Sequence, residues 1–306
     1  MPPQELVAQA RRAEEAGFPF ALISDHFHPW MDRQGESPFV WSTLGGIAQV
    51  TDRMAIGTGV TAPIIRYHPA IVAQATTTVA DMLPGRFFLG VGTGEYLNEH
   101  ITGKHWPPIS RRQAMLEEAV GIIRSLWDGN YTTRYGDFYT VENARLYTLP
   151  ETLPPIHVAA SGPDSGDLAG RIGDGLISTA PDAETIQAFT GAGGKGKPRY
   201  GQMTVCWAED RQEAMQTARD IWGYAALPGQ MSQELALPAY YDAATELVTP
   251  ETICFAIVSG PDVEQYLEQI QQYADAGFTH VYLHQIGPDQ AGHLRFAQTQ
   301  PLPHFA

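Results

Sequence analysis

Short apolar runs and longer amphipathic stretches alternate along the chain. The runs are bounded by glycine, proline or small polar residues, as buried strands are, and the stretches between them repeat apolar residues every three or four positions. The pattern predicts strands over Phe20–Ile23, Met54–Val60, Arg86–Val91, Ile156–Ala160, Leu176–Thr179, Gln202–Cys206 and Thr279–Leu283. It predicts helices around Leu6–Ala13 and over Val40–Gln49, Pro69–Met82, Ile109–Trp127, Asp164–Ile172, Arg211–Trp222 and Asp262–Ala276.

Strict alternation of apolar strands with helices is typical of a parallel α/β sheet. At 306 residues we expect one domain over residues 1–306, a (β/α)8 TIM barrel with insertions. Only seven strands are predicted, and the sequence opens directly on a helix. We therefore expect the first barrel strand to be missing from this sequence, either because it lies upstream or because the barrel is incomplete.

Two segments interrupt the alternation. Residues Tyr131–Tyr147 alternate aromatic and polar side chains about Gly136 and Asp137, which predicts an inserted β-hairpin. Residues Gly223–Pro250 are rich in Ala, Leu, Tyr and Pro and contain no Lys or Arg, which predicts a helical excursion over one face of the barrel. We expect this second insertion to shape a substrate pocket.

The charge of the chain limits its partners. It has 34 acidic and 19 basic residues, and its net charge of -15 disfavours nucleic acid, whose binders need a basic surface. No apolar stretch is long enough to span a membrane, and the first residues lack the pattern of a signal peptide. The two cysteines, Cys206 and Cys254, lie in apolar contexts and suggest neither a disulfide nor a metal site. We expect a cytoplasmic protein.

A polar cluster follows the first predicted strand. Asp25, His26 and Trp30 come where Phe20–Ile23 must end, and in α/β barrels the catalytic groups lie at the carboxyl ends of the strands. A carboxylate, an imidazole and an indole together provide a charge, a proton acceptor and an aromatic wall. His26 is thus a candidate general base. The alternative, in which Asp25 only caps the next loop and His26 is a half-exposed histidine without a function, remains open.

Three other predicted strands end in glycine-rich turns. These turns are Gly57–Pro63, Gly90–Glu95 with Asn98 beyond it, and Ala159–Asp164, where Asp164 or Ser165 can cap the next helix. Glycines let backbone approach a flat ligand closely, and a helix N-terminus favours an anion. The three turns together indicate one flat, anionic cofactor, whereas any one alone is an ordinary strand-to-helix turn. The spacing does not match a dinucleotide-binding fingerprint.

Two further motifs resemble known sites but match them poorly. Gly191–Pro198 imitates a phosphate-binding loop, but Pro198 stands where a magnesium-binding Ser or Thr is needed. His26 and His28 imitate the histidine pair of metal-dependent barrel hydrolases. That class stays open as an alternative, although Ser161 and Thr179 stand where further ligands belong, so we expect no metal.

In these motifs the chain resembles the luciferase-like superfamily, and within it the branch of coenzyme F420-dependent glucose-6-phosphate and alcohol dehydrogenases. The resemblance rests on SDHF with Trp30, RYHPA, AQATTTV, LGVGTGEYLNE and AASGP followed by AGRIGDG. It implies a (β/α)8 barrel, commonly a homodimer, that holds the deazaflavin F420 at the carboxyl ends of its strands.

The resemblance also assigns roles. It implies that His26, Trp30 and Glu95 are catalytic, with His26 as base and Glu95 as proton donor to the reduced ring. It implies a non-prolyl cis peptide bond between Gly59 and Val60. The positions that it implies for cofactor contact are Asp25, Gly59, Val60, Thr93, Gly94, Asn98, Ser161, Gly162, Asp164 and Ser165.

The expected substrate site departs from the sugar-phosphate enzymes. Thr179 is retained, but Asp182 and Phe255 stand where that branch has basic residues. Because a carboxylate repels phosphate, we predict an F420-dependent dehydrogenase of an unphosphorylated alcohol or sugar, with Phe255 lining the pocket. The alternatives are a glucose-6-phosphate dehydrogenase, an FMN-dependent luciferase-like monooxygenase and a non-enzymatic cofactor-binding homologue. For the first of these, Arg66, Lys195 and Lys197 are the candidate phosphate ligands.

Overall fold

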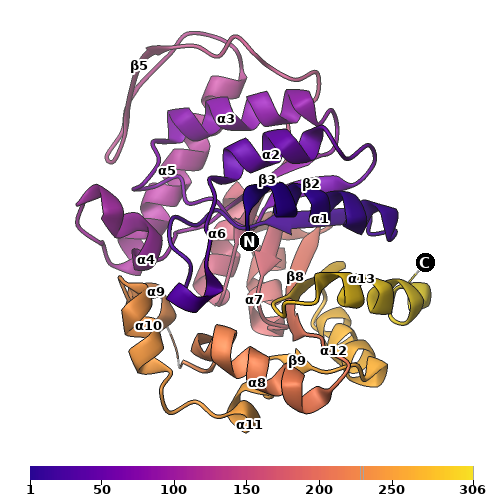
Figure 1. The fold of residues 1–306 in the computed structure, drawn as a ribbon. Coiled ribbons are helices and arrows are strands. Elements are labelled where there is room, and N and C mark those ends of the chain that lie inside the picture. Colours follow the sequence, from indigo (N-terminus) through magenta and orange to yellow (C-terminus); the bar gives the residue numbers. More distant parts are fainter. Residues whose placement is uncertain (228, 230, 306) are drawn as a thin grey trace.

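The computed structural model describes residues 1–227, 229 and 231–305. Parallel strands form a sheet that curves into a nearly closed barrel, with helices around it (Figure 1). The strands of this sheet are β1 (Phe20–Ile23), β2 (Ala55–Thr58), β3 (Phe87–Val91), β6 (Ile156–Ala159), β7 (Gly175–Ser178), β8 (Arg199–Cys206), β9 (Val258–Ser259) and β10 (His280–Gln285). Their order is β1-β2-β3-β6-β7-β8-β10, and β9 pairs with the end of β8. The predicted TIM-barrel class is therefore confirmed.

The two end strands of that order meet through side chains. The ring of Phe20 on β1 lies edge-on to Tyr200 of β8 and His280 of β10, with centroids 5.2 and 5.6 Å apart. The seven strands in that order are the seven predicted, and the described residues show no ladder between β1 and β10, so the gap expected from a missing strand lies there. The short strand β9, which pairs with β8 off this path, was not predicted. Its two residues are too few to give an apolar run that the sequence pattern can detect.

Most helices lie where the sequence predicts them. The remaining ones are short or lie in the insertions, except α13, a 10-residue helix after β10 that the sequence pattern did not predict. The predicted set comprises α1 (Pro3–Glu15), α2 (Val40–Ala48), α3 (Pro69–Met82), α5 (Ile109–Trp127), α6 (Pro163–Ile172), α8 (Arg211–Trp222) and α12 (Val263–Asp275). The others are α4 (Tyr96–Glu99), α7 (Ala183–Phe189), α9 (Met231–Glu234), α10 (Pro238–Ala244), α11 (Pro250–Ile253) and α13 (Gln290–Thr299). Among the described residues no helix is long and apolar enough to cross a membrane.

Both insertions have the predicted character. Strands β4 (Thr132–Tyr135) and β5 (Thr140–Ala144) form an antiparallel hairpin. Within Gly223–Pro250 the described residues form a 3-10 turn at Gly223–Ala226 followed by α9 and α10. Residues 228 and 230 of this segment lie outside the described residues.

The main core lies between the barrel and its helices. Leu89, Val91, Ile156, Val158 and Leu176 of the central strands are fully buried there. Burial of such side chains contributes about 1.5–3 kcal/mol each to stability. This packing fixes the positions of the strand ends, where the loops of the candidate site begin.

Candidate active site

The cluster after β1 is anchored through Asp25. Its carboxylate is 3% exposed and accepts hydrogen bonds from Thr61 Oγ1 at 2.9 Å, Arg66 Nη2 at 2.9 Å and Tyr67 Oη at 3.1 Å. All three partners come from the loop after β2. Asp25 therefore ties the ends of two neighbouring strands together, and these contacts occupy both carboxylate oxygens.

A second buried carboxylate completes this network. Glu99 accepts the Arg66 backbone N–H at 2.7 Å, and Glu99 Oε1 lies 3.6 Å from Arg66 Nε. The Asp25, Arg66 and Glu99 side chains are 1%, 7% and 1% exposed. Burial raises the pKa of Glu99 to about 7, although the Arg66 N–H and charge act in the opposite direction. We call these three residues, with Tyr67, the Asp25 network.

Asn98 joins the candidate catalytic residues. Its side-chain amide donates to Glu95 Oε2 at 3.2 Å, while its Oδ1 accepts the backbone N–H groups of Phe27 at 2.8 Å and His28 at 3.2 Å. Asn98 is 1% exposed. One buried amide thus fixes the loop that carries His26 relative to the carboxylate of Glu95, which makes the pair a candidate acid–base site.

An aromatic wall borders His26. The imidazole lies edge-on to Trp30 with ring centroids 5.2 Å apart, and Trp30 stacks on Tyr224 at 4.5 Å. Tyr241 packs edge-on against Trp30 at 5.3 Å. Tyr224 and Tyr241 both come from the Gly223–Pro250 excursion, so this insertion contributes to the candidate site as predicted.

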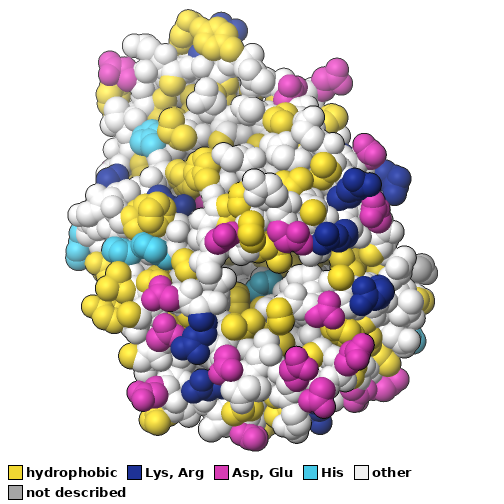
Figure 2. Space-filling view, in the orientation of Figure 1, with side chains coloured by type: hydrophobic (Ala, Val, Ile, Leu, Met, Phe, Trp, Pro, Cys, Tyr) yellow, Lys and Arg dark blue, Asp and Glu magenta, His cyan; other side chains and the backbone are white. Residues whose placement is uncertain are grey.

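His284 on β10 is a further histidine beside this wall. Its ring lies edge-on to Trp222 with centroids 4.8 Å apart. Burial lowers its pKa to about 4, with a smaller contribution from His26. His284 is therefore neutral at pH 7. Figure 2 shows a hollow near the middle of one face of the molecule, with a histidine side chain inside it.

The three glycine-rich turns meet at the strand ends. A Cβ added to Gly92 would lie 2.8 Å from Val60 Cγ2 and 3.3 Å from the Cβ of Ala159, so the turns after β2, β3 and β6 are in contact there. Gly94 has a φ of +69°, and an added Cβ would lie 3.0 Å from Ala62 and Glu99. The peptide bond between Gly59 and Val60 is cis, as the resemblance implied.

The start of α6 borders open space. A Cβ at Gly162 would meet nothing within 4 Å, and Ser165 Oγ accepts the N–H of Ser161 at 3.0 Å and donates to Gly162 O at 2.9 Å. Asp164 and Ser161 are exposed, and Thr93 and Gly94 are half-buried. A tight glycine floor beside an open helix N-terminus fits a flat ligand that carries an anionic group.

The predicted substrate residues lie differently. Thr179 is exposed at the end of β7, as expected. Phe255 is 95% exposed just after α11, so the prediction that it lines the pocket was wrong. Instead, Tyr224 and Tyr241 pack on Trp30, the ring that borders His26, and Trp222 packs on Tyr224. Asp182 is the N-cap of α7, where it accepts the Glu184 N–H at 3.1 Å and the Thr185 hydroxyl.

Two of the three candidate phosphate ligands, Arg66 and Lys197, are engaged elsewhere, and Lys195 is exposed. Arg66 is held by Asp25 and Glu99, and Lys197 Nζ donates to the carbonyl oxygens of Gly170 at 2.9 Å and Gly173 at 2.8 Å. His28 turns toward Leu97 O at 2.9 Å and does not pair with His26. In residues 1–227, 229 and 231–305, no group of three or more His, Cys, Asp or Glu side chains is placed to hold a metal ion.

Sequence reasoning missed Glu99, Tyr67, Tyr224, Tyr241 and His284. Contacts such as that between Tyr67 and Asp25 join residues far apart in the chain, and no local pattern reports them. A signal existed only for Glu99, which lies one helical turn beyond Glu95 and therefore points near the same turn.

Known proteins agree with this architecture. The sequence model of the luciferase-like monooxygenase family matches residues 1–280. The F420-dependent glucose-6-phosphate dehydrogenase of Nakamurella multipartita is 37% identical over 98% of this chain and 92% of its own, and that of Mycobacterium tuberculosis is 33% identical over 98% and 94%. A solved F420-dependent secondary alcohol dehydrogenase, in complex with an F420-acetone adduct, matches with a TM-score of 0.91 and 32% identity, over 98% of this chain and 94% of its own.

A more distant structure, the coenzyme F420-dependent tetrahydromethanopterin reductase from Methanopyrus kandleri, has a TM-score of 0.81 at 19% identity and shows the shared fold. The predicted resemblance and the predicted cofactor class are confirmed by these relatives. The chain belongs to the luciferase-like monooxygenase family.

Proposed function

We propose that this protein is an F420-dependent dehydrogenase that transfers hydride between an alcohol carbon and the deazaflavin. The observation that carries the proposal is the contact of three strand-end turns at Gly92 beside the linked His26 and Glu95 loops. When bound, the deazaflavin supplies a carbon that accepts or donates hydride. The names of the relatives support the same cofactor and reaction class.

The candidate catalytic residues have defined tasks in this proposal. The His26 imidazole takes the proton of the substrate hydroxyl as hydride leaves the carbinol carbon, and the ring of Trp30 stabilises the resulting imidazolium. Glu95 holds a proton at its carboxyl for the cofactor, and Asn98 keeps that carboxyl in place. The turns at Gly59, Val60, Thr93 and Gly94 would support the ring, and Ser161, Gly162, Asp164 and Ser165 would hold its anionic side chain.

Two substrate classes are candidates. The most similar relatives named above are glucose-6-phosphate dehydrogenases, so their names give more support to a sugar phosphate than to the unphosphorylated alcohol expected from the sequence. One set of observations favours the second class. Asp182 caps α7 near Thr179, Arg66 and Lys197 are engaged elsewhere, and the wall beside His26 is aromatic.

The decisive assay follows the loss of F420 absorbance with glucose 6-phosphate, glucose and a secondary alcohol such as 2-propanol in parallel. Reduction of F420 by any of the three supports the proposed chemistry, and their relative kcat/KM assigns the class. No reduction by any alcohol or sugar phosphate, despite bound F420, would contradict the dehydrogenase. A homodimer and a cytoplasmic location remain parts of the proposal, and sedimentation equilibrium tests the first.

A further inference from the structure

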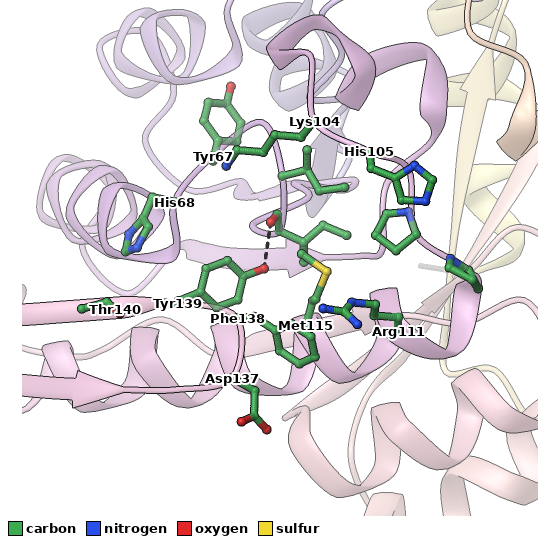
Figure 3. A pocket seen from close by; sticks show the side chains of 14 residues that line it. Tyr67, His68, Lys104, His105, Arg111, Met115, Asp137, Phe138, Tyr139 and Thr140 are labelled. Atoms are coloured by element: carbon green, nitrogen blue, oxygen red, sulfur yellow. Dashed lines mark hydrogen bonds between the residues drawn. The ribbon is translucent and has the colours of Figure 1, made fainter.

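A cavity of about 610 Å³ lies next to the Asp25 network, whose Tyr67 is among its lining residues (Figure 3). It opens between the start of α5, the tip of the β4–β5 hairpin and the segment that leads into α3. His26, Trp30 and Glu95 are not among its lining residues. Its volume is within the range of about 300–1,000 Å³ that is typical of small-molecule sites.

The walls of this cavity are fixed by hydrogen bonds. The Glu118 carboxylate on α5 accepts the backbone N–H groups of Asp137 at 3.0 Å and Tyr139 at 2.9 Å, which pins the hairpin tip to the helix. Tyr139 Oη donates to Ile64 O at 2.8 Å, so the hairpin is also tied to the loop after β2 (Figure 3). The cavity is therefore built before any ligand arrives, which limits the ordering cost of binding.

Two exposed cations line the cavity, and neither has a carboxylate partner among the described residues. Arg111 and Lys104 form no ion pair in the part of the chain that the structure describes, and the Arg111 guanidinium lies 5.2 Å from the centre of the Phe138 ring. Figure 3 shows Lys104 beside Tyr67 and Arg111 beside Met115 and Phe138. In a chain with 34 acidic and only 19 basic residues, two unpaired cations in one cavity are a local reversal of charge.

The rest of the lining is mainly apolar or aromatic, and Asp137 is its one carboxylate. In Figure 3 the Asp137 side chain points away from the other labelled groups. Burial lowers the pKa of His68, and the Lys104 charge adds a smaller effect, so His68 is neutral at pH 7. The positive charge thus comes from Arg111 and Lys104, set against apolar surface.

We propose that this cavity is a second binding site, for a small amphipathic anion with an aromatic or acyl body and a carboxylate or sulfonate head. The guanidinium of Arg111 binds the head through charge-assisted hydrogen bonds, and the ammonium of Lys104, on the other side of the cavity, adds a weaker attraction through its charge. Ile65, Met115 and Phe138 cover the body. The site does not depend on the proposed function, since none of its residues takes part in hydride transfer.

Calorimetric titration of the full chain with naphthalene-2-sulfonate and with uncharged 2-naphthylmethanol tests this site. The sulfonate should bind at least tenfold more tightly than the alcohol. Arg111→Gln should weaken the sulfonate by about tenfold or more, the usual effect of losing a charge-assisted contact, and Lys104→Gln by a smaller factor. Arg145→Gln is the matched control, because Arg145 also stacks on aromatic rings near the hairpin but lies outside the cavity.

Met115→Trp provides a test that does not depend on charge. The larger side chain should fill the cavity and abolish binding of the sulfonate, while an unchanged Tm would show that the fold is intact. Equal affinity for both probes, unchanged binding in Arg111→Gln, or full binding in Met115→Trp would each overturn the proposal. So would an affinity that falls as protein concentration rises, because a second copy of the chain would then be the occupant.

Discussion

The loops after β1, β2 and β3 carry His26, and the Gly223–Pro250 excursion packs on its neighbour Trp30, but different forces hold the two regions. The first group is fixed by the Asp25 network and by Asn98, and apart from the half-buried Tyr67 these side chains are almost completely buried. The excursion is held by aromatic rings that pack on Trp30 and by two ion pairs, Arg33–Asp242 and Arg112–Glu234, whose carboxylates are 29% and 49% exposed. Buried polar contacts require particular partners, whereas apolar packing tolerates substitution at similar volume. Under the proposed function, this difference predicts that the cofactor side is sensitive to substitution and that the substrate side can vary.

The proposed catalytic pair, His26 and Glu95, should show the largest effect of substitution. His26→Ala and Glu95→Gln should each lower kcat by about two to four orders of magnitude, the usual contribution of a positioned base or acid. F420 affinity should stay within a few-fold. His28→Ala is the control, since His28 bonds Leu97 O and stacks on His100. Near-normal kcat in either variant would remove that residue from the mechanism.

Removing the cation of the Asp25 network tests the buried side directly. Arg66→Met should destabilise the fold by about 3–5 kcal/mol, because Asp25 and Glu99 would remain buried without their partner. Arg33→Met breaks the exposed pair with Asp242 and should cost less than about 1 kcal/mol. Urea denaturation of both variants measures the difference. Equal losses would show that the two sides are held alike.

The pH dependence of the free energy of unfolding should show the titration of the Glu99 carboxyl. Its folded pKa of about 7 lies above its ordinary value of 4.5, so the folded state binds a proton that the unfolded state has released between these values. Stability contributed by this proton is fully present below pH 4.5 and is lost as pH rises through 7. Relative to Glu99→Gln, the wild type should therefore lose about 2–3 kcal/mol between pH 5 and pH 8.

Comparing variants at each pH removes the opposite contribution of His157, His284 and His293, whose pKa values burial lowers to about 4. Glu142→Gln, at an exposed position on β5, should follow the wild type at every pH. A constant difference between the wild type and Glu99→Gln would show that Glu99 does not titrate in this range.

The smallest effect is expected on the substrate side. Tyr224→Leu removes the ring that stacks on Trp30 and should raise the KM of the alcohol substrate by about tenfold. F420 affinity should change less than twofold. Tyr240→Leu, an exposed tyrosine on α10, should leave both unchanged. A large loss of F420 affinity in Tyr224→Leu would break the separation between the two sides.

Much of this architecture could be predicted because it depends on patterns among residues that are close together in the sequence. The strand and helix periods located most elements, and the glycine turns located three of the loops that meet at Gly92. The Asp25 network could not be predicted, since Arg66 and Glu99 reach Asp25 only when separate strand ends are brought together. Phe255 was misplaced for a related reason, because its alignment with a basic position says nothing about how the inserted excursion packs around it.

Equilibrium titration of the purified protein with coenzyme F420 and, separately, with FMN tests the central claim most directly. Binding of F420 should quench its fluorescence with a micromolar or lower Kd, since the three turns and the start of α6 fit a flat anionic ligand. FMN should bind much more weakly and should not be retained through purification. Retained FMN with no response to F420 would contradict the account and indicate a flavin-dependent monooxygenase.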